Sequence, residues 1–111
     1  MPANLEKVLE LEGVESAVEF TDDGKIVGFA GAVTEETANL MADLFATNMK
    51  MARWQANLFT ALTGISGFDE ELTGFSIKGP ELSFCVIENI GIFFKNATSD
   101  LNEIYRELSN I

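Results

Sequence analysis

The residue types that carry most enzyme chemistry are scarce in this sequence. The chain of 111 residues contains no histidine and a single cysteine, Cys85. Histidine is the commonest general base and the commonest metal ligand, so neither a Ser-His-Asp nor a Cys-His arrangement can be built. One cysteine also excludes a CxxC motif and an internal disulfide. The sequence therefore predicts a protein that is not an enzyme.

Acidic residues occur in three runs that could serve as paired carboxylates or cation ligands. The runs are Asp22-Asp23, Glu35-Glu36 and Asp69-Glu70-Glu71. A hairpin turn, a helix start and a loop, respectively, explain them better. The third run lacks the spaced oxygen ligands of a calcium loop. We therefore expect no catalytic residue, no metal site and no cofactor.

The charge of the chain limits its partners. The formal net charge is −11, from 18 acidic and 7 basic residues, which makes nucleic acid and anionic membrane surfaces poor partners. No segment has the composition of a membrane span or of a signal peptide, so we expect a cytoplasmic location. The acidic charge serves either solubility or the steering of a basic protein partner.

A long helix is predicted over residues 34–62, which contain neither glycine nor proline. Thr34 can cap it, Glu35 and Glu36 suit its positive end, and Gly64 ends it. The helix would be roughly 43 Å long. A compact chain of this size is only roughly 34 Å across. A helix longer than its own globule packs on another molecule, and a second copy is the simplest candidate.

Shorter elements flank this helix. The pattern predicts a helix over 4–11, strands over 14–20 and 26–30 joined by a hairpin at 21–24, strands over 72–78, 82–87 and 91–95, and a helix from Thr98 or Ser99 to 109. In the first strand Glu15 and Glu19 fall on one face, which predicts an exposed polar rim. Gly28 and Gly31 leave room for a close neighbour, for which the long helix is the candidate.

These elements predict the layers of the fold. The strand at 82–87 is apolar on both faces, so both faces must be covered. We expect the long helix on one face and the two short helices on the other. The result is an α/β (α+β) fold, a three-layer α/β/α sandwich around a five-stranded, largely antiparallel sheet. We expect one domain over residues 1–111.

One side of the long helix should form the seam of a dimer. Leu40, Leu44, Met51, Leu58 and Leu62 can line an apolar row, with a second row beside it. Buried amides at such a seam can fix its register by bonding across it. The residues expected nearest the two-fold axis are Phe45, Asn48, Met51, Ala52, Gln55 and Phe59.

The opening Leu-Glu-Lys-Val-Leu-Glu-Leu-Glu-Gly-Val-Glu-Ser-Ala-Val, followed by Asp-Asp-Gly-Lys-Ile-Val, resembles the roadblock family of dynein light chains, and in particular its prokaryotic relatives. The shared features are a first helix ending in Gly13-Val14, a strand with the small Ala17, and a hairpin at Asp23-Gly24. The resemblance implies a roadblock/profilin-like order of one helix, two strands, a helix, three strands and a helix.

The same resemblance implies a homodimer. In that family the central helices of two protomers pack together and the third strands pair into one continuous sheet, which corresponds here to residues 34–62 and 72–78. Leu72, Gly74 and Ser76 would then lie at the interface. Bacterial relatives bind or regulate small Ras-like GTPases, so the resemblance implies a regulatory adaptor with such a partner.

Two other classes of function remain open. A pocket between the sheet and the terminal helices would make a small-molecule sensor, lined by Phe84, Phe93, Phe94 and Tyr105. Alternatively, Cys85 could act in redox or sulfur transfer, with Lys78 and Lys95 as the nearby cations that activate a thiol. Simple burial also explains a cysteine in an apolar strand.

Overall fold

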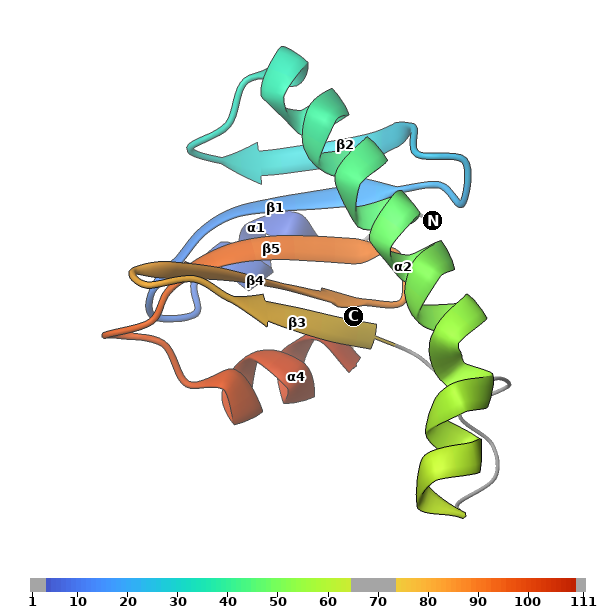
Figure 1. The fold of residues 1–111 in the computed structure, drawn as a ribbon. Helices are drawn as coiled ribbons and strands as arrows, with labels where there is room; N and C mark the ends of the chain where they lie inside the picture. The colour runs from blue at the N-terminus through green and yellow to red at the C-terminus, as the bar shows by residue number, and fades with distance from the viewer. Residues whose placement is uncertain (1–3, 65–73, 110–111) are drawn as a thin grey trace.

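The structure, a computed structural model, describes residues 4–64 and 74–109 (Figure 1). Its elements, in chain order, are α1 (Leu5–Leu9), β1 (Val14–Phe20), β2 (Ile26–Gly31), α2 (Glu35–Thr63), β3 (Gly74–Lys78), β4 (Leu82–Ile87), β5 (Ile90–Lys95) and α4 (Leu101–Ser109). The strands form one sheet in the order β2-β1-β5-β4-β3, with every neighbouring pair antiparallel. α2 crosses one face, and α1 and α4 cover the other. The predicted order and the three layers are confirmed.

Both ends of α2 are set by local chemistry that the sequence carries. The Thr34 hydroxyl accepts a hydrogen bond from the Thr37 N–H at 3.2 Å and so caps the N-terminus. Gly64 has a left-handed conformation, φ 72°, and its N–H donates to the Thr60 carbonyl at 2.9 Å. The helix has 29 residues and is about 43 Å long. Since the longest extent of the protein is 40 Å, α2 is as long as the globule.

The core between α2 and the sheet is organised around the ring of Phe45, which is fully buried. Its centroid lies 5.4 Å from that of Phe84 and 5.9 Å from those of Phe20 and Phe93. The ring sits on Gly91 of β5, where an added Cβ would lie 2.2 Å from Phe45 Cδ2. Gly91 therefore lets α2 approach the middle of the sheet. Other buried members of this core are Val18, Ala38, Met41, Ala42, Ala46, Met49 and Val86.

The core on the opposite face joins α1 and α4 to the same sheet. Its buried residues are, from the helices, Leu5, Val8, Ile104 and Leu108 and, from the sheet, Ala17, Ala30, Cys85, Ile87, Ile90, Ile92 and Phe94. β4 contributes to both cores, with Cys85 facing the short helices and Val86 facing α2. The prediction that this strand is covered on both faces is confirmed.

β1 is buried on both faces, which corrects the exposed rim predicted for Glu15 and Glu19. Glu19 is only 7% exposed, and Asn89 Nδ2 donates a hydrogen bond to its Oε2 at 3.5 Å. Glu15 is half-buried and pairs with Lys95 at 3.4 Å. The reason is that α1 covers this face, because Ala17, which shares the face with both glutamates, is buried in one core with Leu5 and Val8. Alternation shows which residues share a face but not whether that face is covered.

α4 begins later than the sequence predicts. A start at Thr98 or Ser99 is expected, but the helix begins at Leu101, with Asp100 before it. Asp100 Oδ1 accepts hydrogen bonds from the N–H groups of residues 102 and 103, at 3.0 and 3.4 Å. A carboxylate caps as well as a hydroxyl does, and its charge also suits the positive end of the helix dipole.

The glycines of β2 make room for α1 and not for α2. A Cβ on Gly28 would lie 3.8 Å from Leu5 Cδ1, and one on Gly31 would lie 3.0 Å from Leu9 Cδ2. Both leucines belong to α1, which ends at Leu9 and not at residue 11. The predicted close neighbour therefore exists, but it lies on the opposite face of the sheet.

We predict that Gly91→Ala lowers the free energy of unfolding by about 1–3 kcal/mol, because the new methyl group would overlap the buried ring of Phe45. Urea unfolding followed by circular dichroism measures this loss. Gly28→Ala is the matched control in another strand of the same sheet, and it should be no less stable than the parent protein. Equal urea midpoints for the parent and Gly91→Ala would show that Phe45 does not sit on β5.

Cys85 is fully buried, and burial raises the pKa of its thiol to about 12. We predict that iodoacetamide at about pH 8 leaves the native protein unmodified and alkylates it in denaturant, since only the thiolate reacts. Because the thiol has a higher pKa in the folded state, the folded protein keeps its proton where the unfolded chain loses it. The contribution of this difference to the free energy of unfolding is fully present below the ordinary thiol pKa, near 9.0, and is lost as the pH rises toward 12. Rapid labelling of the native protein, read by mass spectrometry, would restore the hypothesis of a reactive cysteine.

Candidate interaction surface

α2 packs on its own sheet with only the first half of its length. Every α2 residue of the core around Phe45 lies between Ala38 and Met49. The second half continues past the β3 end of the sheet, as Figure 1 shows. Ala56 is still buried there, but the large apolar side chains around it are exposed. The helix therefore presents apolar surface that its own protomer does not cover.

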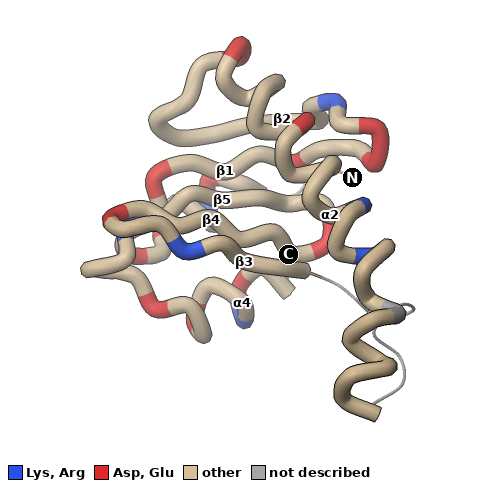
Figure 2. Tube along the Cα trace, in the orientation of Figure 1, with Lys and Arg blue, Asp and Glu red and all other residues tan. Residues whose placement is uncertain are grey.

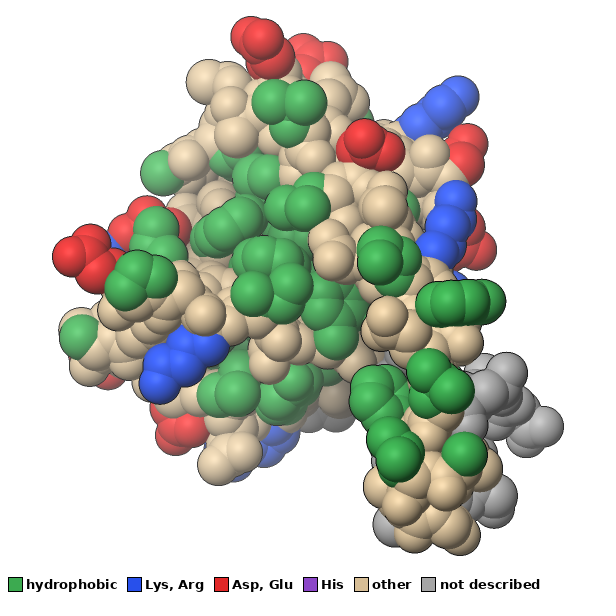
Figure 3. Space-filling model, in the orientation of Figure 1, with side chains coloured by type: hydrophobic (Ala, Val, Ile, Leu, Met, Phe, Trp, Pro, Cys, Tyr) green, Lys and Arg blue, Asp and Glu red, His purple; other side chains and the backbone are tan. Residues whose placement is uncertain are grey.

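The outer side of α2 carries a row of exposed apolar side chains along most of the helix. Their exposed fractions range from 42%, at Leu44 and Phe59, to 82% at Leu62. The charged residues of the same stretch, Asp43, Lys50 and Arg53, fall outside this arc at 100° per residue. Figure 3 shows the apolar side chains along the projecting part of the helix. We call this set the apolar stripe: Leu40, Leu44, Met51, Trp54, Leu58, Phe59 and Leu62.

Phe45 does not belong to this surface, which corrects its place among the predicted seam residues. Its ring lies in the core of its own protomer, on Gly91. The helix is apolar on two sides, and periodicity alone does not say which side faces the sheet. Residue size does carry that information, because a close approach to a sheet requires small side chains. The sheet-facing side is rich in alanine, at Ala38, Ala42 and Ala46.

The other predicted seam residues of α2 lie on or beside the apolar stripe. Met51 and Phe59 belong to it, with exposed fractions of 52% and 42%. Asn48, Ala52 and Gln55 are half-buried along its flank. The Asn48 amide is already engaged within the helix, since Nδ2 donates to the carbonyl of residue 44 at 2.8 Å. The predicted set omitted the most exposed members, Trp54 and Leu62, which are 76% and 82% exposed.

The edge strand β3 contains the remaining predicted interface residues. It lies at one end of the sheet and, within the part of the chain that the structure describes, pairs with β4 alone. Ser76 is exposed, and Gly74 is half-buried. A Cβ on Gly74 would lie 2.2 Å from the Val86 carbonyl oxygen, so this glycine serves the pairing with β4. Leu72 lies outside the described residues.

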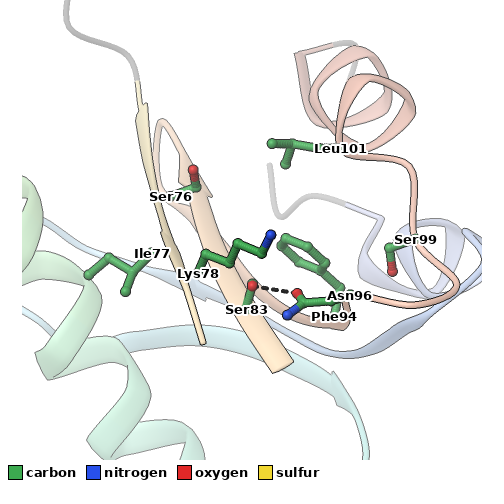
Figure 4. A pocket seen from close by; sticks show the side chains of 8 residues that line it. All are labelled: Ser76, Ile77, Lys78, Ser83, Phe94, Asn96, Ser99 and Leu101. Carbon is green, nitrogen blue, oxygen red and sulfur yellow. Dashed lines mark hydrogen bonds between the residues drawn. The ribbon is translucent and has the colours of Figure 1, made fainter. Parts of the chain in front are cut away.

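The sheet near β3 is uncovered on the side that faces α2. Ile77 of β3 and Leu82 of β4 are 45% and 42% exposed. Ile77 pairs with Phe84, whose ring packs on Phe45, and Figure 4 shows Ile77 pointing toward α2 and away from Lys78. In Figure 3 apolar side chains gather over the sheet beside the helix. One face of the protein thus combines a projecting apolar helix with an open apolar area of sheet.

The four aromatic residues proposed for a ligand pocket do not line one cavity. Phe84 and Phe93 pack toward α2, with their rings 5.4 Å apart, whereas Phe94 and Tyr105 pack toward the short helices. The two pairs therefore lie on opposite faces of the sheet, which contradicts the pocket that the sequence suggested.

A small cavity does exist beside Phe94, between β3 and the start of α4 (Figure 4). Its volume is about 220 Å³, below the roughly 300–1,000 Å³ of ordinary ligand pockets. The Ser83 hydroxyl donates to Asn96 Oδ1, and Asn96 Nδ2 donates to the Gly79 carbonyl at 2.8 Å. The Ser83 and Asn96 side chains are thus occupied in holding the β3–β4 turn, whereas the Ser99 hydroxyl of the same wall is buried without a hydrogen-bond partner among the described residues. The small volume of the cavity gives no support to a sensor.

The described residues offer little other chemistry. Within residues 4–64 and 74–109, no three acidic or cysteine side chains come together as metal ligands would. Nor does any helix in that part of the chain combine the length and the apolar character needed to cross a bilayer. The feature that stands out is therefore the apolar stripe with the open sheet beside it.

The fold is shared with solved roadblock-domain structures. The Roadblock/LC7 domain from Streptomyces avermitilis has a TM-score of 0.79 at 14% identity, over 95% of this chain and 85% of that chain. Gliding protein MglB from Thermus thermophilus gives 0.74 at 18% identity, over 96% and 78%. MglB in a tetrameric arrangement gives 0.75 at 18% identity, over 96% and 77%. At these identities the likeness establishes the roadblock fold and so confirms the resemblance seen in the sequence.

No curated protein matches the chain. One family model, described as "Uncharacterized conserved protein (DUF2173)", matches residues 4–110. That range includes every helix and strand of the structure. The chain therefore belongs to the DUF2173 family and has the fold of a roadblock domain.

Proposed function

We propose that this protein is a non-catalytic adaptor or regulator that works as a homodimer. Two copies pack through the apolar stripe of α2 and pair through the free edges of β3. The observation that carries the proposal is that one protomer has both a projecting apolar helix and an open apolar area of sheet. In a dimer the helix of each copy can cover the open sheet of the other.

A two-fold arrangement brings these surfaces together. With the α2 helices antiparallel, the projecting half of each helix reaches toward the sheet of the other copy. Leu58 and Leu62 would then cover the area around Ile77 and Leu82, all of which are exposed in the single protomer. Complete burial of one such side chain stabilises by about 1.5–3 kcal/mol, and symmetry doubles every contact.

The edge of β3 supports the same arrangement. An edge strand leaves backbone N–H and C=O groups without sheet partners, and pairing with a second strand satisfies them. β3 lies at the end of the sheet past which α2 projects, so helix packing and strand pairing can occur at one interface (Figure 1). MglB, which has the same fold, exists in a tetrameric arrangement, so self-association is compatible with this fold.

A protein partner completes the proposal, and the roadblock resemblance points to a small Ras-like GTPase. A non-catalytic dimer acts by holding or orienting another molecule. The net charge of −11 favours a partner with a basic contact surface, because opposite charge accelerates association.

We predict that the protein sediments with twice its chain mass of 12.1 kDa at micromolar concentration, and that Met51→Glu sediments as a monomer. Met51 is 52% exposed in the protomer, so glutamate there leaves the fold intact. At the interface each buried carboxylate would cost about 3 kcal/mol, twice per dimer. Val27→Glu on β2 is the control, because Val27 is 50% exposed and β2 lies at the opposite end of the sheet from β3, and it should remain a dimer. A dimeric Met51→Glu of normal affinity would reject the α2 interface.

We predict that immobilised protein captures a Ras-like GTPase from a lysate of its own host. Parallel captures with GDP and with a non-hydrolysable GTP analogue, identified by mass spectrometry, show whether the nucleotide controls binding. Added salt should weaken the capture if the acidic charge contributes. Absence of any GTPase in both captures, from a dimer of confirmed mass, would remove this partner while leaving the homodimer standing.

A further inference from the structure

The sheet has a second free edge, at the end opposite β3. β2 is the other terminal strand, and among the described residues Ile26–Gly31 pairs with β1 alone (Figure 1). The dimer proposed above uses β3 and leaves this edge in solvent. β2 therefore offers a binding surface that is separate from the homodimer.

Within its own length β2 lacks the side chains that protect edge strands from pairing, although Lys25 directly precedes it. Natural edges usually carry lysine, proline or another charge, as β3 does with Lys78 and the nearby Pro80. Residues 26–31 contain neither a charged residue nor a proline. A register shift in the pairing with β1 marks a bulge near Val27, but the pairing from Gly28 to Gly31 is regular. An edge of this composition is an open template for another strand.

The strand also exposes apolar side chains. Val27 is 50% exposed and Phe29 is 38% exposed. Phe29 pairs with Val18, which belongs to the core under α2, so Phe29 points to the α2 side of the sheet. A strand added at this edge would place every second side chain on the same face of the sheet as Phe29. Its backbone would form hydrogen bonds with the free edge of β2.

Acidic groups outnumber basic ones at both ends of β2, since Lys25 is the one basic residue in the turn before it. Asp22 and Asp23 lie in the turn before it, and Glu35 and Glu36 lie in the first turn of α2 after it (Figure 2). The Thr21 hydroxyl donates a hydrogen bond to Asp23 and lowers the pKa of that carboxyl, so the carboxyl is ionised at neutral pH. A second copy would bring the same acids against these, and like charges repel. The charge therefore favours a different chain with basic flanks.

We propose that the free edge of β2 binds an extended segment of a partner protein. The segment has apolar residues at alternate positions and lysine or arginine on both sides. It adds one antiparallel or parallel strand to the sheet, with backbone hydrogen bonds giving affinity and the acidic flanks giving selectivity.

The test uses a fluorescein-labelled peptide, Lys-Arg-Val-Thr-Val-Thr-Val-Arg-Lys, and fluorescence anisotropy at about 0.1 M salt. The peptide should bind saturably, and a version with glutamate in place of its four basic residues should not. Phe29→Lys should weaken binding by about tenfold or more, because it places a charge on the edge. Leu101→Lys is the matched control, since Leu101 is 37% exposed against 38% for Phe29, and it should bind normally.

A second variant tests the charge without touching the strand. Glu35→Gln combined with Glu36→Gln should lower the affinity for the basic peptide by about threefold or more and reduce its salt dependence. Three results would overturn the proposal: no saturable binding, equal binding of the basic and acidic peptides, or normal binding by Phe29→Lys. Self-association beyond the dimer that Phe29→Lys abolishes would assign the edge to a second copy and would also overturn it. None of these results bears on the dimer mass measured with Met51→Glu.

Discussion

The contact between the Phe45 ring and Gly91 fixes where α2 crosses the sheet. The ring needs a position where the strand below carries no side chain, and Gly91 supplies it in β5. Gly91 pairs with Val18 on one side and Val86 on the other, and both are buried in the core around the ring. Shifting the helix by one turn would set the ring against branched side chains. Protein interiors are packed close to their maximum density, so the core has no room for a ring and a branched side chain at the same place.

The rest of the surface follows from this anchor. An unbroken helix is stiff, so a contact in its first half determines where its second half goes. Here the second half passes the β3 end of the sheet and carries its leucines into solvent. The same placement leaves the sheet around Ile77 and Leu82 uncovered. The projecting helix and the open sheet are therefore two results of one geometrical constraint, and both appear in a single protomer.

The order and type of the elements could be predicted because caps, glycines and periodicity are local signals. The start of α2 at Thr34 and its end at Gly64 are examples. The residues whose burial was predicted wrongly are buried by neighbours that lie far away in the chain. The burial of Glu19 follows from the short helices covering its face of the sheet, and the burial of Phe45 follows from which side of α2 meets β5. Periodicity identified two apolar rows on α2 but could not rank them. The alanines at 38, 42 and 46 held that information, because small side chains mark the closer approach.

The position of Gly91 in the chain has a consequence for biosynthesis. A ribosome completes α2 long before it makes β5, so the ring of Phe45 leaves the exit tunnel with no place to dock. Until β4 and β5 are added, the helix is apolar on both sides and can rest only on β1 and β2. Contacts so distant along the chain slow folding and prolong the time during which a nascent chain can aggregate. Like charges repel, so the acidic residues of the early segments oppose such association.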